Sequence, residues 1–244
     1  METVEKTTSA VGDGIKMGTG RWSFGSGVAT HFDDHVSKSV PLYTEGHSLI
    51  ASLSDFFVHR DSICYELGCS TGTLIARLAR KHADLGDARF IGVDTEFQMI
   101  EHARKMHAEL SNLSFVLADA TDFSFEPADL IVAYYMFQFI APKRRQPLFD
   151  RIYQSLNWGG AFVLFEKTRA NDARFQDMFT TLYNEYKMSQ GYDAVEILGK
   201  TMSLKGVLEP YSTQANHDFL IRAGFKDVIS LQKYLSFEGF LAVK

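Results

Sequence analysis

Short apolar runs alternate with segments of helical periodicity between residues 62 and 165, and this alternation constrains the fold more than any other feature of the chain. Between the runs, residues such as Leu74, Ile75 and Leu78 recur at helical spacing. Strands that alternate with helices pair in parallel, and the helices cover both faces of the sheet. The sequence therefore predicts an α/β fold with a doubly wound, mostly parallel sheet. The runs that we interpret as strands span residues 62–67, 89–94, 115–118, 130–134 and 161–165.

The end of the chain predicts two more strands, 227–235 and 237–243, with almost nothing between them, which is typical of a tight antiparallel hairpin. With this C-terminal hairpin the predicted sheet has seven strands. Before it, an apolar stripe runs along residues 172–189, and no strand is predicted up to about Pro210. We expect residues 168–215 to form a helical lid inserted between two strands. The stripe comprises Phe175, Met178, Phe179, Leu182, Tyr183 and Tyr186.

The chain before the first predicted strand divides into two parts. Residues 1–20 are polar, rich in Gly, Thr and Ser, and lack periodicity, so we expect a flexible N-terminus. Residues 21–60, which include Trp22, His31 and His35, are expected to form a helical cap that either packs on the domain or lies over a site. With 244 residues in all, the chain is expected to hold a single domain over 21–244.

Composition argues against several classes of protein. The chain has 25 Lys and Arg against 30 Asp and Glu, a net charge of −5, which disfavours non-specific binding to nucleic acid. The basic run 143–145 is interpreted as a solvated helix face, so a tRNA partner is not expected. Apolar stretches are far shorter than the roughly 20 residues of a membrane span. Cys64 and Cys69, without a signal peptide, disfavour disulfides and zinc, so no metal is predicted and a cytoplasmic location is expected.

The most informative motif is Glu66-Leu67-Gly68-Cys69-Ser70-Thr71-Gly72-Thr73, between a predicted strand and a predicted helix. Its glycines follow GxxxG spacing, which is not the GxGxxG of a dinucleotide site, and no GK[ST] of a P-loop follows. Such a turn brings backbone close to a ligand without dense negative charge. The carboxylate of Glu66 would repel a phosphate and attract an ammonium group.

Two more acids follow the next predicted strands. Asp94 ends the second strand, where an acid in a nucleoside-binding fold accepts hydrogen bonds from ribose hydroxyls. Asp119 follows the third strand, where its carboxylate or the adjacent backbone would meet an adenine amino group. Two or three carboxylates without a basic cradle suit a neutral or cationic nucleoside. S-adenosylmethionine (SAM), which carries a sulfonium and an ammonium, is such a ligand.

The chain from Gly20 onward resembles the class I SAM-dependent methyltransferases, and among them the carboxy-SAM synthases that serve wobble-uridine modification of bacterial tRNA. The resemblance rests on Trp22-Ser23-Phe24, Ser39-Val40-Pro41 with Tyr43, Leu67-Gly68-Cys69-Ser70, Gln138-Phe139, Ile152-Tyr153-Gln154, Leu156-Asn157, Gly159-Gly160-Ala161, Glu166-Lys167, Gly191-Tyr192 and Ala223-Gly224-Phe225. It implies a Rossmann-like fold with cofactor contacts from Tyr43, Gly68, Cys69, Ser70, Asp94, Thr95, Asp119 and Ala120. Glu66, Gly72, Met99 and Tyr134 complete the predicted SAM site.

Two positions depart from that family. Tyr134 stands where the family has an asparagine after the fourth strand. Thr201 follows Lys200 in the predicted lid, where the family has an arginine that pairs with the extra carboxylate of carboxy-SAM. Removing one partner of such a buried pair costs about 3 to 5 kcal/mol, or about a hundredfold to several thousandfold in affinity. A lysine offers a point charge and not a fork, so we expect this chain to use ordinary SAM.

These observations predict a SAM-dependent methyltransferase that acts on a small molecule. The candidate catalytic residues are Tyr134, Tyr135, Tyr192 and Glu166, with Tyr43, His31 and His35 as further groups near the cleft. Three alternatives remain open: formation of carboxy-SAM from SAM and a carboxyl donor such as prephenate, cleavage or cyclisation of SAM itself with release of methylthioadenosine, and a non-catalytic SAM-binding subunit. The aromatic stripe of the lid would suit the buried face of a homodimer.

Overall fold

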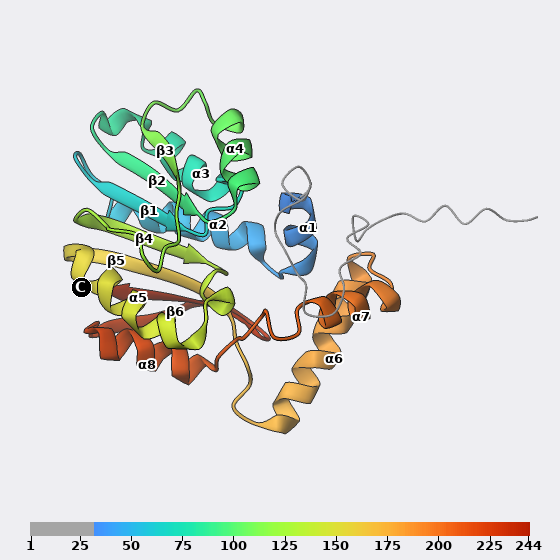
Figure 1. Cartoon of the computed structure of the whole chain (residues 1–244). Helices are drawn as coiled ribbons and strands as arrows, with labels where there is room; N and C mark the ends of the chain where they lie inside the picture. The colour runs from blue at the N-terminus through green and yellow to red at the C-terminus, as the bar shows by residue number, and fades with distance from the viewer. Residues whose placement is uncertain (1–31) are drawn as a thin grey trace, which may run out of the picture.

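Seven strands form one sheet in the order β3-β2-β1-β4-β5-β7-β6 (Figure 1). The computed structural model describes residues 32–244; the predicted flexible segment 1–20, and Trp22 and His31 of the predicted cap, lie outside the described residues. The first five strands pair in parallel, and β7 is antiparallel to β5 and β6. The predicted sheet and its C-terminal hairpin are thus confirmed. The strands are β1 (Ile63–Leu67), β2 (Arg89–Asp94), β3 (Leu113–Leu117), β4 (Ala128–Tyr134), β5 (Leu156–Lys167), β6 (Asp227–Tyr234) and β7 (Phe237–Val243).

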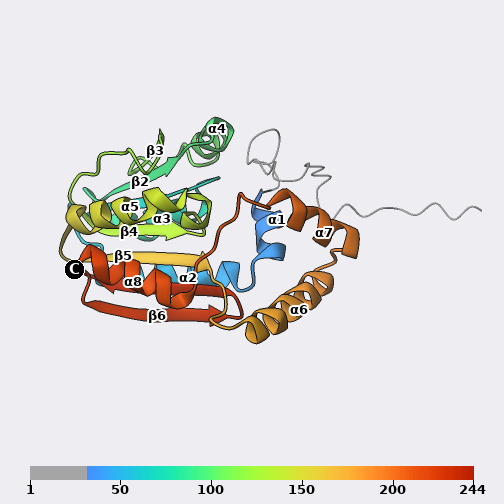
Figure 2. The same ribbon diagram turned by 60° about the horizontal axis from the view of Figure 1, so that its bottom comes forward.

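Helices cover both faces of the sheet (Figures 1 and 2). On one face pack α2 (Tyr43–Leu53), α3 (Thr73–Lys81) and α4 (Phe97–Met106); on the other pack α5 (Pro142–Ser155) and α8 (Thr213–Ala223). Because both faces are covered, every residue of β1 and β4 is buried, which explains their unbroken apolar runs. Short 3-10 turns complete the layers: η1 (Ser54–Phe56), η2 (Ala83–Leu85) and η3 (Phe137–Phe139).

The strand ends differ from the prediction by a few residues. The strands β3 and β4 each begin two residues earlier than the apolar runs suggest. Residues 157–160, which precede the predicted strand 161–165 and which we read as a break before it, lie inside β5, but the register shifts there: Ala128 pairs with Leu156 while Leu130 pairs with Ala161. Gly159 has φ of 83° in this bulge and donates its amide to the carbonyl of Lys244. The predicted break is therefore a bulge that this glycine permits.

The predicted lid holds α6 (Ala173–Ser189) and α7 (Ala194–Ser203), which lie at one end of the molecule beside α1 (Phe32–Ser39) (Figure 2). The periodicity did not predict α7. Its start carries a capping box, in which Asp193 and Glu196 each accept the other's backbone amide, and this D-x-x-E signal is readable in the sequence. The predicted lid boundary at 215 cuts into α8, which packs against α5 and belongs to the sheet layer.

The apolar stripe of α6 divides between the interior and the surface. Tyr183 packs on the core of the domain, whereas Phe175, Met178 and Leu182 are about half exposed. Among the described residues, no helix has both the length and the apolar character needed to cross a bilayer.

Candidate active site

A cavity of about 560 Å³ lies beyond the carboxyl ends of the parallel strands and reaches to α1, α6 and α7. Most of the residues predicted for the site line it, although they come from separate parts of the chain. Gly72, Glu166 and Tyr192 are not part of the lining. The predicted residues that do line it are Tyr43, Glu66, Gly68, Cys69, Ser70, Asp94, Thr95, Met99, Asp119, Ala120, Tyr134 and Tyr135.

The glycine loop turns sharply after β1. Gly68 and Cys69 donate their amides to the carbonyl of Val93 at 2.8 and 3.1 Å, which fastens the loop to β2. Gly72, with φ of 75°, lies in the left-handed region, and a Cβ there would come within 2.5 Å of the Phe115 ring. A side chain is excluded there on both counts. Gly72 therefore shapes the loop and the start of α3 without reaching the cavity.

Asp94 at the end of β2 is held in place by the backbone. Its Oδ2 accepts the Ser70 amide at 2.8 Å, and its Oδ1 accepts the Glu96 amide at 2.9 Å. Burial raises the pKa of Asp94, and the backbone amides partly oppose that rise. The carboxylate is thus fixed before any ligand arrives.

Glu66 lies deeper, at the end of β1, and is only 4% exposed. Its Oε2 accepts the Ile75 amide of α3 at 2.9 Å. Burial raises its pKa well above the usual value, and the neighbouring charges of Asp94 and Asp33 add to that rise. A cation placed in the cavity would favour the charged form. This donor set fits the ammonium group of SAM.

Asp33 of α1 is a site residue that the sequence analysis missed. Its carboxylate accepts hydrogen bonds from the hydroxyls of Thr71, at 3.0 Å, and Thr73, at 2.8 Å, and so ties α1 to the glycine loop. Asp33 also lines the cavity. No local pattern marks it, because its partners lie far along the chain.

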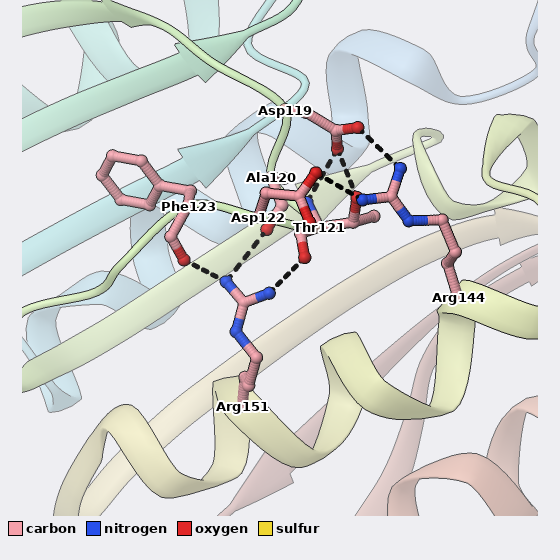
Figure 3. A network of polar contacts seen from close by, with 7 residues as sticks. All are labelled: Asp119, Ala120, Thr121, Asp122, Phe123, Arg144 and Arg151. Carbon is pink, nitrogen blue, oxygen red and sulfur yellow. Dashed lines mark hydrogen bonds and ion pairs between the residues drawn. The ribbon is translucent and has the colours of Figure 1, made fainter.

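Asp119 follows β3, and its carboxylate is held by its own loop and by α5. Oδ1 accepts the amide and the hydroxyl of Thr121 at 2.8 and 2.6 Å, and Oδ2 accepts from Arg144 at 2.9 Å. A second arginine, Arg151, donates to backbone carbonyls of the same loop (Figure 3). Burial alone would raise the pKa of Asp119, but Thr121 and Arg144 outweigh it and hold the pKa below its usual value. We call the side lined by Asp33, Glu66, Asp94 and Asp119 the acidic half of the cavity.

Tyrosine rings line the middle of the cavity. The hydroxyl of Tyr134 donates to the carbonyl of Tyr43 at 2.7 Å, so it is already engaged. Tyr135 stacks on Tyr43 with 6.3 Å between ring centroids, and its backbone has φ of 59°. Its buried hydroxyl has no hydrogen-bond partner among residues 32–244. A bulky residue in the left-handed region with an unsatisfied polar group is typical of a functional position.

Lysines line the opposite end of the cavity, which we call the basic half: Lys167 at the end of β5 and Lys200 on α7. The Lys167 ammonium lies over the rings of Tyr183 and Phe237, at 4.7 and 5.7 Å from their centroids. Lys187 lies over the same Tyr183 ring at 4.5 Å, outside the cavity lining. The sequence analysis named Lys167 only as part of a motif that carries the family resemblance, and it did not name Lys187.

Lys200 is held by the helix α1. Its ammonium donates to Ser39 Oγ at 2.7 Å and lies 2.8 Å from His35 Nε2. Burial, with help from the charge of Lys200, lowers the pKa of His35 to about 3, so the ring is neutral and accepts from the lysine. Tyr192 lies behind this group, with its hydroxyl 2.9 Å from Ser39 Oγ. The neighbouring Thr201 is exposed and donates its hydroxyl to the carbonyl of Ile197 in its own helix.

Glu166 lies away from the cavity, although it precedes Lys167 in β5. Neighbours in a strand point to opposite faces of the sheet. Burial raises the pKa of Glu166 to about 8, and the charge of Arg145 opposes that rise. Its side chain therefore belongs to the layer between the sheet and α5.

Known proteins resemble this chain over most of its length. A family model described as "Methyltransferase domain" matches residues 65–160. A carboxy-S-adenosyl-L-methionine synthase of Campylobacter lari is 37% identical over 225 residues, covering 92% of this chain and 95% of that protein. A protein of the same name from Staphylococcus epidermidis is 33% identical, with 92% and 97% covered. This chain belongs to the carboxy-SAM synthase family.

Solved structures share the fold at lower identity. The SAM-dependent methyltransferase SibL, in its apo form, has a TM-score of 0.62 and 17% identity, with 89% of this chain and 59% of that chain covered. Human N-acetylserotonin methyltransferase, solved with SAM, has a TM-score of 0.60 and 19% identity, with 89% and 56% covered. The protein is thus an enzyme of the class I methyltransferase fold that uses SAM, and its acidic half provides the groups that fit this cofactor.

Proposed function

We propose that this protein transfers the methyl group of SAM to a small-molecule acceptor. The observation that carries the proposal is the division of one cavity into an acidic half at the ends of β1, β2 and β3 and an aromatic and basic half under α6 and α7. SAM would occupy the acidic half, with its ammonium near Glu66 and its ribose near Asp94. The acceptor would occupy the other half, in line with the methyl group and the sulfur. Methyl transfer then depends mainly on alignment of the reacting atoms.

Tyr135 is the proposed catalytic residue. Of the four predicted candidates, Tyr134 has its hydroxyl bound to backbone, and Glu166 and Tyr192 lie outside the cavity lining. Burial raises the pKa of the Tyr135 hydroxyl well above its usual value, so this group keeps its proton and would orient the acceptor through a hydrogen bond.

The test is the chemical identity of the bound molecule and of the product. Purified protein should carry SAM or S-adenosylhomocysteine in native mass spectra, and either one should raise its melting temperature. An acceptor pool incubated with methyl-labelled SAM should then acquire the label. A protein that neither carries nor responds to these two molecules would contradict the proposal.

Carboxy-SAM synthesis is the second candidate, because relatives that are 37% and 33% identical to this chain carry that name. One observation favours it. Thr201, which stands where the family has an arginine, does not line the cavity, but the neighbouring Lys200 does and places a cation there. A co-purifying ligand heavier than SAM by the mass of one CO2 would support this activity. Release of methylthioadenosine without any acceptor would instead show that SAM itself is consumed.

A homodimer that buries the outer face of α6 and α7 is also proposed. Exposed apolar side chains gather on these two helices, and patches of this kind mark interfaces. Sedimentation of the wild type and of Leu198→Glu, which places a charge on this face, should give a dimer and a monomer. The exposed apolar side chains are Phe175, Met178, Leu182, Met188, Val195, Leu198 and Met202.

A cytoplasmic location and the absence of a tRNA partner complete the proposal. Cys64 and Cys69 are both buried free thiols, which suits a reducing compartment. The basic run 143–145 is largely engaged within the protein, because Arg144 pairs with Asp119 and Asp122 and Arg145 is only 3% exposed. These arginines are therefore poorly placed to contact phosphates.

A further inference from the structure

The side-chain nitrogen of Lys167 lines the cavity without a polar partner. It lies over the rings of Tyr183 and Phe237, at 4.7 and 5.7 Å from their centroids. Among residues 32–244 it forms no ion pair and donates no hydrogen bond. A lysine that stays charged inside a protein is normally paired, because an unpaired buried charge is costly. The surroundings of Lys167 therefore favour the neutral amine.

Nearby positive charges add to this preference. Lys187 of α6 lies over the same Tyr183 ring at 4.5 Å, and Arg169 stands two residues after Lys167. Burial and the charge of Arg169 lower the pKa of Lys167 to about 8, and burial and the charge of Lys167 lower the pKa of Lys187 to about 8. The adjacent acid, Glu166, does not line the cavity. A lysine that is desolvated or lies next to another cation is activated as a nucleophile.

The other polar groups at this end of the cavity are already engaged. Lys200 donates to Ser39 Oγ at 2.7 Å and lies 2.8 Å from His35 Nε2. The hydroxyl of Tyr183 donates to the carbonyl of Ser39 at 2.7 Å. Lys167 and Lys200 are the two lysines of the described lining. Of these two, Lys167 is the one whose nitrogen is left to react with a ligand.

We propose that Lys167 is a nucleophilic amine that forms an imine with the carbonyl group of an aldehyde or a ketone. The nitrogen of the neutral amine attacks the carbonyl carbon and forms a C–N bond. Both protons of that nitrogen pass to the carbonyl oxygen, which leaves as water, so a C=N bond remains and nothing is oxidised or reduced. The rings of Tyr183 and Phe237 would pack an apolar body of the ligand beside this bond. The inference rests on the proposed function for the place of the acceptor, and it makes that acceptor a carbonyl compound.

The probe for the test is benzaldehyde with sodium cyanoborohydride, whose hydride reduces the imine to a stable benzylamine. The protein is labelled briefly at limiting benzaldehyde, with and without S-adenosylhomocysteine, and peptide mass spectrometry quantifies the benzyl group on each lysine. At neutral pH a lysine with a pKa of about 8 has about three-hundredfold more neutral amine than one at the usual 10.5. A less basic amine is also a weaker nucleophile, so Lys167 should be labelled at least about tenfold faster than Lys105, an exposed lysine of α4.

Variants and pH separate a nucleophile from a positive charge. Lys167→Met and Lys167→Arg should both lose the fast adduct, the latter although it keeps the charge, because a guanidinium stays protonated. Lys105→Met is the matched control and should keep the fast adduct. Lys200, in the same cavity, should react no faster than Lys105. The labelling rate at Lys167 should rise with pH and level off above about 8, since the neutral amine is the reacting form.

Labelling of Lys167 in the wild type at the rate of Lys105, or a fast adduct that survives in Lys167→Arg, overturns the inference. Titration of S-adenosylhomocysteine alone is measured first, and its binding to Lys167→Arg shows that this variant is folded. Absence of that binding in the wild type contradicts the proposed function, whereas intact cofactor binding without selective labelling contradicts only the imine.

Discussion

The two halves of the cavity differ in how completely the protein satisfies their charged groups. In the acidic half, Asp94 and Asp119 already accept two or more hydrogen bonds each, and Asp33 accepts two hydroxyls. In the basic half, the Lys167 ammonium lies over the rings of Tyr183 and Phe237 and forms no ion pair or hydrogen bond among residues 32–244. The acidic half is preorganised for one cofactor, while the described residues leave the Lys167 ammonium without a counter-charge. Variants in the acidic half should therefore lose stability or cofactor affinity, and removal of Lys167 should have the opposite effect on stability.

The largest effect is expected for Gly72→Ala. The left-handed backbone costs about 1 kcal/mol, and the new Cβ, 2.5 Å from the Phe115 ring, adds an overpacking cost of about 1 to 3 kcal/mol. The free energy of unfolding, measured in urea, should fall by the sum of these two costs. Gly86→Ala is the matched control, because Gly86 also has a positive φ but nothing lies within 4 Å of its Cβ position. Equal losses in the two variants would refute the close packing of the loop.

Asp94→Ala should weaken binding of S-adenosylhomocysteine by about thirtyfold to a hundredfold, the value of one or two charge-assisted hydrogen bonds. Calorimetric titration measures it. Asp94→Asn keeps the shape of the side chain and one acceptor oxygen but removes the charge, and should lie between Ala and wild type. Asp84→Ala, at an exposed acid, serves as control. An unchanged affinity in Asp94→Ala would place the cofactor elsewhere.

Tyr135→Phe should lower kcat for methyl transfer by about tenfold, the value of one hydrogen bond in the reacting complex. Stability should stay unchanged, because the hydroxyl has no partner in the described residues to lose. Tyr134→Phe, by contrast, loses the bond to the Tyr43 carbonyl and should lower stability instead. The comparison of kcat and unfolding free energy for the two variants separates these roles. If Tyr135→Phe turns over like wild type, the hydroxyl does not touch the acceptor.

Lys167→Met should raise the free energy of unfolding by about 1 kcal/mol at neutral pH. The pKa of Lys167 is lowered from its usual 10.5 to about 8, so between these values the unfolded chain binds more protons than the folded one. The destabilisation that the Lys167 ammonium causes in the wild type is therefore complete below about pH 8 and disappears as the pH rises through that window. The advantage of Lys167→Met should shrink as pH rises through the window. Urea unfolding of the wild type and of Lys167→Met, at one pH below this window and one above it, measures which of the two is more stable.

The smallest effect is expected for Thr201→Arg, which should leave affinity for SAM within about twofold, because Thr201 is exposed and bound to its own helix. The adjacent Lys200→Met removes an ammonium that Ser39 and His35 contact, and should lower the free energy of unfolding instead. Titration of SAM into both variants, together with their urea unfolding, makes the comparison. A strong gain in carboxy-SAM affinity on Thr201→Arg would show that position 201 does reach the ligand.

The sequence predicted the acidic half far better than the basic half, for a physical reason. Glu66, Asp94 and Asp119 each stand at the end of an apolar run, and parallel strand ends meet at one edge, so local patterns suffice. Lys167 also ends a strand, but the pattern could not tell which of Glu166 and Lys167 faces the cavity, since both faces of the sheet are buried. Asp33 reaches the site only through contacts between distant segments, which periodicity does not encode.

The short helix α1 contacts both halves at once. Asp33 at its start holds the hydroxyls of Thr71 and Thr73, and Ser39 at its end receives the ammonium of Lys200. Any displacement of this helix that opens a path to the glycine loop also withdraws a partner of that lysine. We therefore expect the exchange of the nucleoside at the glycine loop to be coupled to the position of Lys200, through a helix of eight residues that belongs to neither the sheet nor the lid.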